Sequence, residues 1–194
     1  MSSTPVCLLD IDGVINSLLL KPPTHAWPQD MWKTGIYESN MNEFPLLWSQ
    51  PVVDYLTRLH VQGRVEFRWH TTWQETAPEF GKIVGLPEFP VADCPEARAN
   101  QGLLAKQQIL KGEPVWWKYP AARRVLTDER RPLIWIDDDL FGNVTKVYRN
   151  GLGQLGKILL LCPDGQTGLL PKHMRQIEEV LLLWEDPRGA VSGS

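Results

Sequence analysis

The sequence has few cysteines, no long apolar run and no large excess of charge of either sign. Its cysteines, Cys7, Cys94 and Cys162, are far apart and form no Cys-x-x-Cys pair, which argues against a disulfide framework or a zinc site. We therefore expect buried thiols in a reducing compartment, the cytoplasm. The longest aliphatic runs span only a few residues, and no basic region precedes an apolar segment at the N-terminus. These features predict neither a membrane span nor a signal peptide.

The net charge of -3 gives no overall attraction to nucleic acid or membrane, so a polyanion would need a local basic patch. At 194 residues, with 43% hydrophobic residues, the chain predicts a single domain over 1–194 with a core of its own. Short apolar segments alternate with helical patterns, which predicts an α/β fold. We expect a doubly wound, mainly parallel sheet with helices on both faces.

The expected strands are 6–9, 65–70, 132–136 and 157–162, with a further strand at 89–92. Helices are expected to begin at Pro51, near Trp73, at Pro120 and at Pro171. Two further helices are expected over 95–111 and 144–148, and the second is expected to be followed by a turn at Gly151 and Gly153.

Residues 17–50 are the least regular stretch, because prolines and glycine interrupt scattered aromatic residues. This composition predicts a flap, either a long ordered loop or a short hairpin, inserted in the domain. The insertion is too small to be a large cap. The tail from 187 to 194 is expected to be loose.

Two carboxylates and a glycine follow the first buried strand abruptly. Asp10 and Asp12 lie two residues apart, so in extended backbone they face the same way, and Gly13 permits a tight turn close to a ligand. Two neighbouring carboxylates need a cation or a shared proton. The alternative is a strand that simply ends in a solvated Asp turn.

Polar side chains also follow the other apolar segments. Thr71 and Thr72 end one strand, where a hydroxyl at a helix entry could bind an oxyanion, and Thr72 with Glu75 fits a capping box. Lys118 precedes a helix, although a lone lysine is usually a solvated surface group. Three acids, 137–139, end the segment 132–136, with solvation as the alternative explanation.

In a parallel α/β sheet the carboxyl ends of the strands meet at one edge, and ligands bind there. Every polar cluster described above lies at such an end or at an adjoining helix entry. This agreement predicts one functional site and is stronger than any single motif.

The order Asp-Ile-Asp-Gly-Val, Thr after an apolar strand, Lys, and Ile-Asp-Asp resembles the four motifs of the haloacid dehalogenase (HAD) superfamily of phosphohydrolases. More narrowly, Leu-Asp-Ile-Asp-Gly-Val-Ile-Asn, Trp-His-Thr-Thr-Trp-Gln-Glu, Arg-Pro-Leu-Ile-Trp-Ile-Asp-Asp-Asp-Leu and Asp-Gly-Gln-Thr-Gly-Leu resemble the HAD domains grouped with "Swiss Army Knife" RNA-repair proteins. That group is related to the phosphatase of phage polynucleotide kinase. The resemblance covers nearly the whole chain and implies an Mg²⁺-dependent phosphatase.

The resemblance implies a role for each matching residue. Asp10 would be the nucleophile that becomes an aspartyl-phosphate, and Asp12 the general acid and base. Thr71 would hold phosphoryl oxygens, with Thr72 as the competing choice. Lys118 would neutralise the nucleophile and the transferring group.

The same resemblance implies the ligands of the metal and the phosphate. Mg²⁺ would be held by Asp10, by Asp137 with help from Asp138, and by the backbone carbonyl of Asp12. Gly13 would let the backbone approach the phosphate. The chemistry is consistent, because a carboxylate attacks a phosphate only if both negative charges are offset.

The resemblance to RNA-repair domains and the absence of a large cap predict a substrate with a terminal phosphate on a nucleotide or nucleic acid. The aromatic residues from Trp27 to Trp48 could stack on bases, and a local basic patch could come from Arg123, Arg124, Arg130 and Arg131. The arginines could equally form a solvated face. The alternative function is a non-catalytic module that binds phosphorylated ends or proteins.

Overall fold

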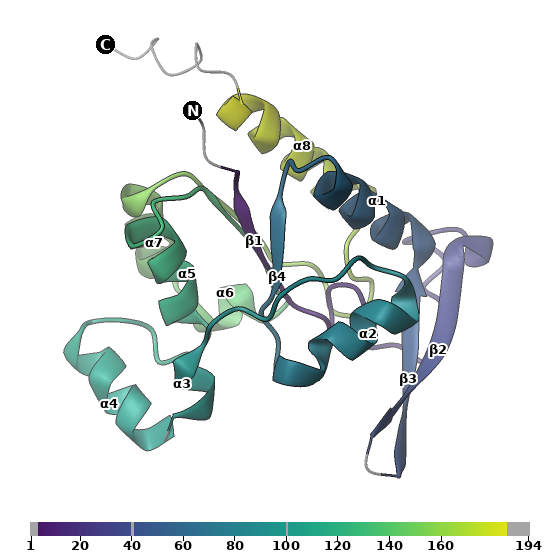
Figure 1. The fold of residues 1–194 in the computed structure, drawn as a ribbon, viewed down its shortest axis with the longest axis horizontal. Helices are drawn as coiled ribbons and strands as arrows, with labels where there is room; N and C mark the ends of the chain where they lie inside the picture. The colour runs from purple at the N-terminus through teal and green to yellow at the C-terminus, as the bar shows by residue number, and fades with distance from the viewer. Residues whose placement is uncertain (1–3, 40, 100, 186–194) are drawn as a thin grey trace.

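The computed structural model describes residues 4–39, 41–99 and 101–185. Its centre is a sheet of four parallel strands in the order β4-β1-β5-β6, of which Figure 1 labels β1 and β4. The strands are β1 (Val6–Leu9), β4 (Glu66–Trp69), β5 (Leu133–Ile136) and β6 (Ile158–Leu161). The prediction of an α/β chain with a parallel sheet is therefore confirmed, and the central strands β1 and β5 are buried along their whole length.

The register brings the carboxyl ends of neighbouring strands to the same level. Leu9 of β1 pairs with Trp69 of β4 on one side and with Ile136 of β5 on the other. The next residues continue this alignment, because the Asp10 N–H donates to the Ile136 carbonyl at 3.0 Å. The side chains that follow these strands therefore emerge at one edge of the sheet.

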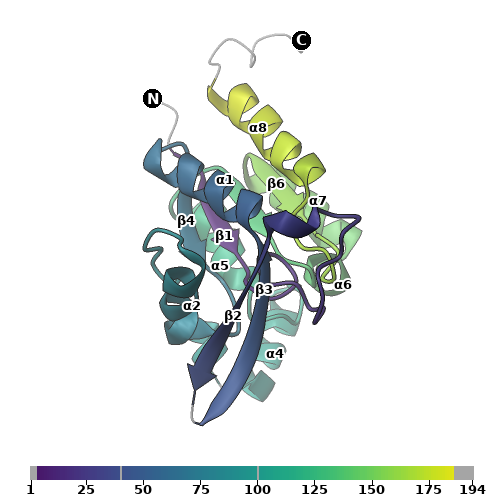
Figure 2. The ribbon, with the colours of Figure 1, turned by 90° about the vertical axis from the view of Figure 1, so that its right-hand side faces the viewer.

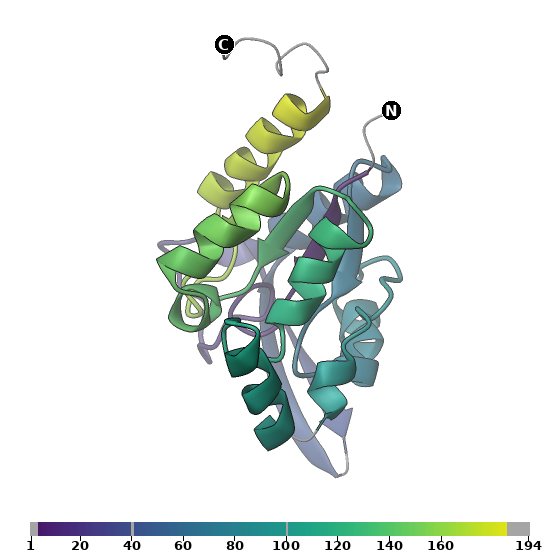
Figure 3. The ribbon, with the colours of Figure 1, turned by 90° about the vertical axis from the view of Figure 1, so that its left-hand side faces the viewer.

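Helices pack against both faces of the sheet. Alternate residues of β1 point to opposite faces, so Cys7 and Leu9 join one apolar cluster while Val6 and Leu8 join the other. Helices α1 (Gln50–Val61), α2 (Ala77–Val84) and α8 (Pro171–Glu185) contribute to the first cluster. Helices α5 (Tyr119–Thr127), α6 (Leu140–Asn143) and α7 (Lys146–Leu155) contribute to the second, and α5 and α7 lie side by side over the sheet in Figure 3.

Residues 17–50 contain a short 3₁₀ helix, η1 (Gln29–Met31), and an antiparallel hairpin of β2 (Trp32–Ser39) and β3 (Asn42–Ser49). Of the two forms predicted for this stretch, the structure shows the hairpin. It projects past the carboxyl ends of the sheet strands (Figure 2). The indole rings of Trp27, Trp32 and Trp48 are buried in the core, so they stabilise the base of the hairpin and offer no stacking surface.

Three predicted elements differ from the structure. The expected strand at 89–92 is wrong, since only a single bridge joins Trp69 to Val91 in this stretch. The expected helix 95–111 is two helices, α3 (Pro95–Arg98) and α4 (Gln101–Leu110). The expected turn at Gly151 and Gly153 is also wrong, because both glycines lie within α7, where tertiary packing outweighs their low helix propensity.

The predicted ends of helix α1 agree with the structure, whereas the predicted capping box after β4 does not. Helix α1 has Pro51 in its first turn and is followed by Gly63 with φ of +65°, as expected. The capping box of Thr72 and Glu75 is wrong: the 3₁₀ helix η2 (Gln74–Thr76) has no side-chain cap, and Glu75 pairs with Arg98 instead. The expected loose tail at 187–194 lies outside the described residues. Within the described ranges, no helix has the length and apolar character needed to cross a membrane.

Candidate active site

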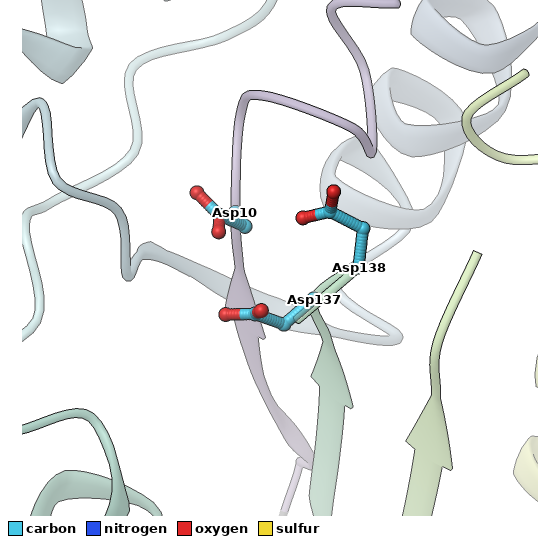
Figure 4. Close-up of side chains that lie close together, drawn as sticks. All are labelled: Asp10, Asp137 and Asp138. Atoms are coloured by element: carbon cyan, nitrogen blue, oxygen red, sulfur yellow. The ribbon is translucent and has the colours of Figure 1, made fainter. Parts of the chain in front are cut away.

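Three carboxylates from the ends of β1 and β5 form a compact cluster (Figure 4). Asp10, Asp137 and Asp138 each offer an oxygen atom, and these atoms all lie within 4.8 Å of one another. Asp10 and Asp137 are buried and Asp138 is half-buried. The third acid after β5, Asp139, is exposed and lies outside this cluster. Hard divalent cations prefer such carboxylate oxygens, so the cluster could hold a metal ion.

Lys118 supplies the positive charge inside this cluster. The residue precedes α5 and is 3% exposed, and its Nζ donates to Oδ2 of Asp10 and, at 2.6 Å, to Oδ2 of Asp137. Burial lowers the pKa of Lys118, but the two carboxylates outweigh it and raise the pKa above its ordinary value. Lys118 is therefore a charged lysine with two carboxylate partners, in contrast to the usual surface lysine.

Backbone donors fix the two carboxylates that Lys118 contacts. The Ile11 N–H donates to Oδ1 of Asp10 at 2.7 Å, and the Asp139 N–H donates to Oδ1 of Asp137 at 3.0 Å. Burial and the nearby Asp10 nevertheless raise the pKa of Asp137, against the opposing effect of Lys118. Burial, followed by the charges of Asp139 and Asp10, raises the pKa of Asp138 to about 6. One ammonium thus faces three carboxyl groups, and a bound cation would relieve the remaining repulsion.

Two glycines leave room for the Asp138 side chain. A Cβ atom on Gly13 would lie 2.1 Å from Oδ2 of Asp138, and one on Gly165 would lie 2.6 Å from the same oxygen. Gly13 also has φ of +70°, which glycine adopts without strain. Its N–H donates to the Asn16 carbonyl within the turn. Gly13 therefore lets the backbone lie close to the Asp138 carboxylate, and its own N–H is already used within the turn.

Asp12 lies apart from this cluster. The chain bends at Ile11, between the two acids, so the strand geometry behind the expected shared orientation ends before Asp12. Oδ2 of Asp12 accepts from Nε1 of Trp73 at 2.7 Å, and Oδ1 accepts from Nδ2 of Asn16 at 2.7 Å. These two donors hold the Asp12 carboxylate toward the hairpin.

The two threonines after β4 have different environments. Thr71 is buried, and its Oγ1 accepts from the Trp73 N–H at 3.4 Å, while Thr72 is exposed. Because the His70 N–H donates to the Leu9 carbonyl, Thr71 follows the strand end that adjoins Asp10. This placement favours Thr71 over Thr72 as the hydroxyl of the site.

Sequence reasoning did not identify the aromatic residues around Lys118. Nζ of Lys118 lies 5.6 Å from the ring centroids of both Trp116 and Trp117, a distance at which an indole attracts a cation. The buried His70 ring contacts Trp117 and Trp135, and burial together with Lys118 holds the pKa of His70 well below its ordinary value. A neutral histidine beside the lysine adds no competing charge. The Trp-Trp-Lys sequence before a predicted helix was the available signal.

The arginines considered as a basic patch are largely paired with acids. Arg124 pairs with Glu96 at 2.6 Å, Arg131 pairs with Glu66 at 2.6 Å, and Arg123 lies 3.7 Å from Glu113. These pairs compensate most of the positive charge that a nucleic-acid backbone would use.

Comparisons of this chain with protein-family models, with curated proteins and with solved structures found no match.

Proposed function

We propose that this protein is a phosphohydrolase of the haloacid dehalogenase type, which acts on a phosphate monoester through an aspartyl-phosphate at Asp10. The observation that carries the proposal is the placement of Lys118 Nζ between Asp10 and Asp137, with Asp138 beside them. A buried lysine with two carboxylate partners offsets charge where an anionic nucleophile must approach an anionic phosphate.

In the first step, an Asp10 carboxylate oxygen bonds to phosphorus and the bond from phosphorus to the leaving oxygen breaks. Asp12 gives its proton to that oxygen. In the second step, Asp12 takes a proton from water as the water oxygen bonds to phosphorus, and the Asp10 carboxylate leaves. The Thr71 hydroxyl donates to a phosphoryl oxygen, and Lys118 stabilises the negative charge in both steps.

The acid cluster fits Mg²⁺, because all three donors are carboxylate oxygens and the lysine leaves their charge undercompensated. Asp10, Asp137 and Asp138 would hold the ion, with the backbone carbonyl of Asp12 as the further ligand that the resemblance implies. Bound there, Mg²⁺ would neutralise charge on the phosphoryl group.

The substrate that we propose carries a terminal phosphate on a nucleotide or on a nucleic-acid end. The hairpin supports this choice, since two of its aromatic side chains, Tyr37 and Phe44, line a pocket together with Asp12.

The test compares Asp10→Asn with Asp139→Asn, which changes an exposed acid outside the cluster. We expect Asp10→Asn to lower Mg²⁺-dependent phosphate release by about 1,000-fold or more, while Asp139→Asn stays near the wild-type rate. Acid-quenched wild-type protein should carry phosphate on Asp10, detected by mass spectrometry. Full activity of folded Asp10→Asn would overturn the mechanism. Tight binding of phosphorylated ligands without any turnover would instead favour the non-catalytic binding module.

A further inference from the structure

A pocket of about 400 Å³ lies between the hairpin and the turn that carries Asp12. Its volume falls within the range of about 300–1,000 Å³ typical of small-molecule sites. It is lined by Asp12, Asn16, Tyr37, Phe44, Trp73 and Thr76, among others. We call it the hairpin pocket.

Three aromatic residues, Tyr37, Phe44 and Trp73, line part of the hairpin pocket. The rings of Tyr37 and Trp73 have centroids 4.7 Å apart, and Tyr37 also contacts Phe44 at 6.1 Å. Tyr37 and Phe44 are cross-strand partners in the hairpin register, so their side chains lie on the same face. Phe44 is 47% exposed, so its ring is accessible to a ligand in the pocket.

Charge distinguishes the hairpin pocket from the acid cluster. No lysine or arginine lines the pocket among the residues that the structure describes. Nothing there would bind a second phosphate, whereas the Lys118 site is built for one. A phosphate ester that reached both sites would place its anionic part beside Lys118 and a neutral part in the hairpin pocket.

Asp12 connects the two sites. It lies two residues after Asp10, and its oxygens are held by Trp73 and Asn16, which both line the hairpin pocket. Asn16 also accepts from the Leu47 N–H at 3.0 Å, which ties the hairpin to this turn. A group that receives its proton from Asp12 would thus occupy the hairpin pocket.

We infer that the hairpin pocket binds the leaving group of the substrate and selects one planar, uncharged aromatic ring system of nucleobase size. This inference rests on the proposed phosphatase function and specifies its substrate class. Offset stacking on Phe44 and Trp73, the two rings that are not buried, supplies the selection. The buried Tyr37 ring contacts both and holds them in place.

Adenosine 5′-monophosphate and ribose 5-phosphate form the matched pair of probes, since they share the phosphate and the sugar and differ in the base. We expect kcat/KM to favour the nucleotide by about 5- to 150-fold, the range expected from stacking one base. Phe44→Ala should lower kcat/KM for the nucleotide by about 5-fold or more and leave that for ribose 5-phosphate unchanged. Tyr37→Leu, which keeps a buried apolar side chain, should act in the same direction.

Ile36→Ala is the matched control, because Ile36 is also an exposed apolar residue of the hairpin but lines the opposite face. It should change neither substrate. Equal kcat/KM for the two probes, or an equal loss for both in Phe44→Ala, would overturn the inference and leave the phosphatase proposal intact.

Calorimetry with folded Asp10→Asn protein separates the two proposals, since it measures binding of both probes with Mg²⁺ in the absence of turnover. Tighter binding of the nucleotide, lost in Asp10→Asn/Phe44→Ala, supports the hairpin pocket even if the wild type hydrolyses neither probe. Equal binding of both probes would refute it.

Discussion

Replacing Lys118 with methionine should destabilise the protein strongly, because it removes the cation from a buried acid cluster. The Nζ atom lies 2.6 Å from Oδ2 of Asp137 and also contacts Asp10. At an effective dielectric constant of about 20, one such contact is worth about 6 kcal/mol before hydration is subtracted. Loss of lysine hydration offsets much of this attraction. Removing one partner of a buried ion pair typically costs about 3–5 kcal/mol, which we expect for Lys118→Met.

Urea unfolding without metal measures this loss. With a urea dependence of about 2 kcal/mol/M, the midpoint should fall by about 1.5–2.5 M. The loss should be greater at pH 8 than at pH 5.5. Without the lysine, the clustered carboxyl groups have raised pKa values, so one of them can take a proton at low pH but loses it as pH rises. Adding Mg²⁺ should restore part of the stability, because the ion replaces the missing charge.

Two controls make the prediction for Lys118→Met specific. Lys157→Met removes an exposed lysine directly before β6 and should change stability by less than about 0.5 kcal/mol. In the Asp10→Asn background, Lys118→Met should cost at least about 1 kcal/mol less than in the wild type, since fewer carboxylates then repel. A loss below about 1 kcal/mol at pH 8, without coupling to Asp10, would refute the assignment of Lys118 as the charge partner of the cluster.

Further predictions concern metal, pH and salt. Asp137→Ala should raise the Mg²⁺ concentration for half-maximal activity by about 10-fold or more, whereas Asp139→Ala should leave it nearly unchanged. A larger effect of Asp139→Ala would show that Asp139, rather than Asp137, binds the metal ion. Burial, then Lys172, lowers the pKa of His173 to about 4, and its Nδ1 accepts from the Leu170 N–H. As the pH falls, His173 therefore takes up a proton at a higher pH in the unfolded chain than in the folded protein. Urea unfolding should show that the free energy of unfolding falls by about 2–3 kcal/mol between pH 6.5 and 4. This decrease should be absent in His173→Asn. Because the arginines are paired with acids, we expect a weak salt dependence for a 5′-phosphorylated oligonucleotide. A plot of log kcat/KM against log salt concentration should have a slope shallower than about -2. A steeper slope would indicate contacts along the nucleic-acid backbone.

The position of the acid cluster was predictable from the sequence, because parallel strands place their carboxyl ends at one edge. Val6–Leu9 and Leu133–Ile136 are short, apolar and followed directly by acids, and the structure shows them as neighbouring strands in register. Whichever helices surround them, Asp10 and Asp137 must then lie close together. Local pattern and topology sufficed for this part of the site.

The partners of those acids were not predictable in the same way. Lys118 reaches Asp10 across 108 residues and Trp73 reaches Asp12 across 61, and neither contact leaves a local pattern. Each depends on how a helix entry packs over the strand ends. The strand expected at 89–92 and the helix expected over 95–111 failed for a related reason, because their apolar patterns fit more than one element and tertiary packing decided between them.

The bend after β1 explains how one short segment can serve two chemically different sites. If the strand had continued, Asp10 and Asp12 would face the same way and would compete for the same cation. The bend at Ile11 and the glycine turn at Gly13 instead leave Asp10 beside Lys118 and turn Asp12 toward Trp73. A nucleophile requires a nearby positive charge, whereas an acid that protonates a leaving group must contact the group that departs. In the mechanism that we propose, the same two-residue spacing would separate the anionic part of a substrate from its neutral part, and the hairpin pocket lies on the side where the neutral part would leave.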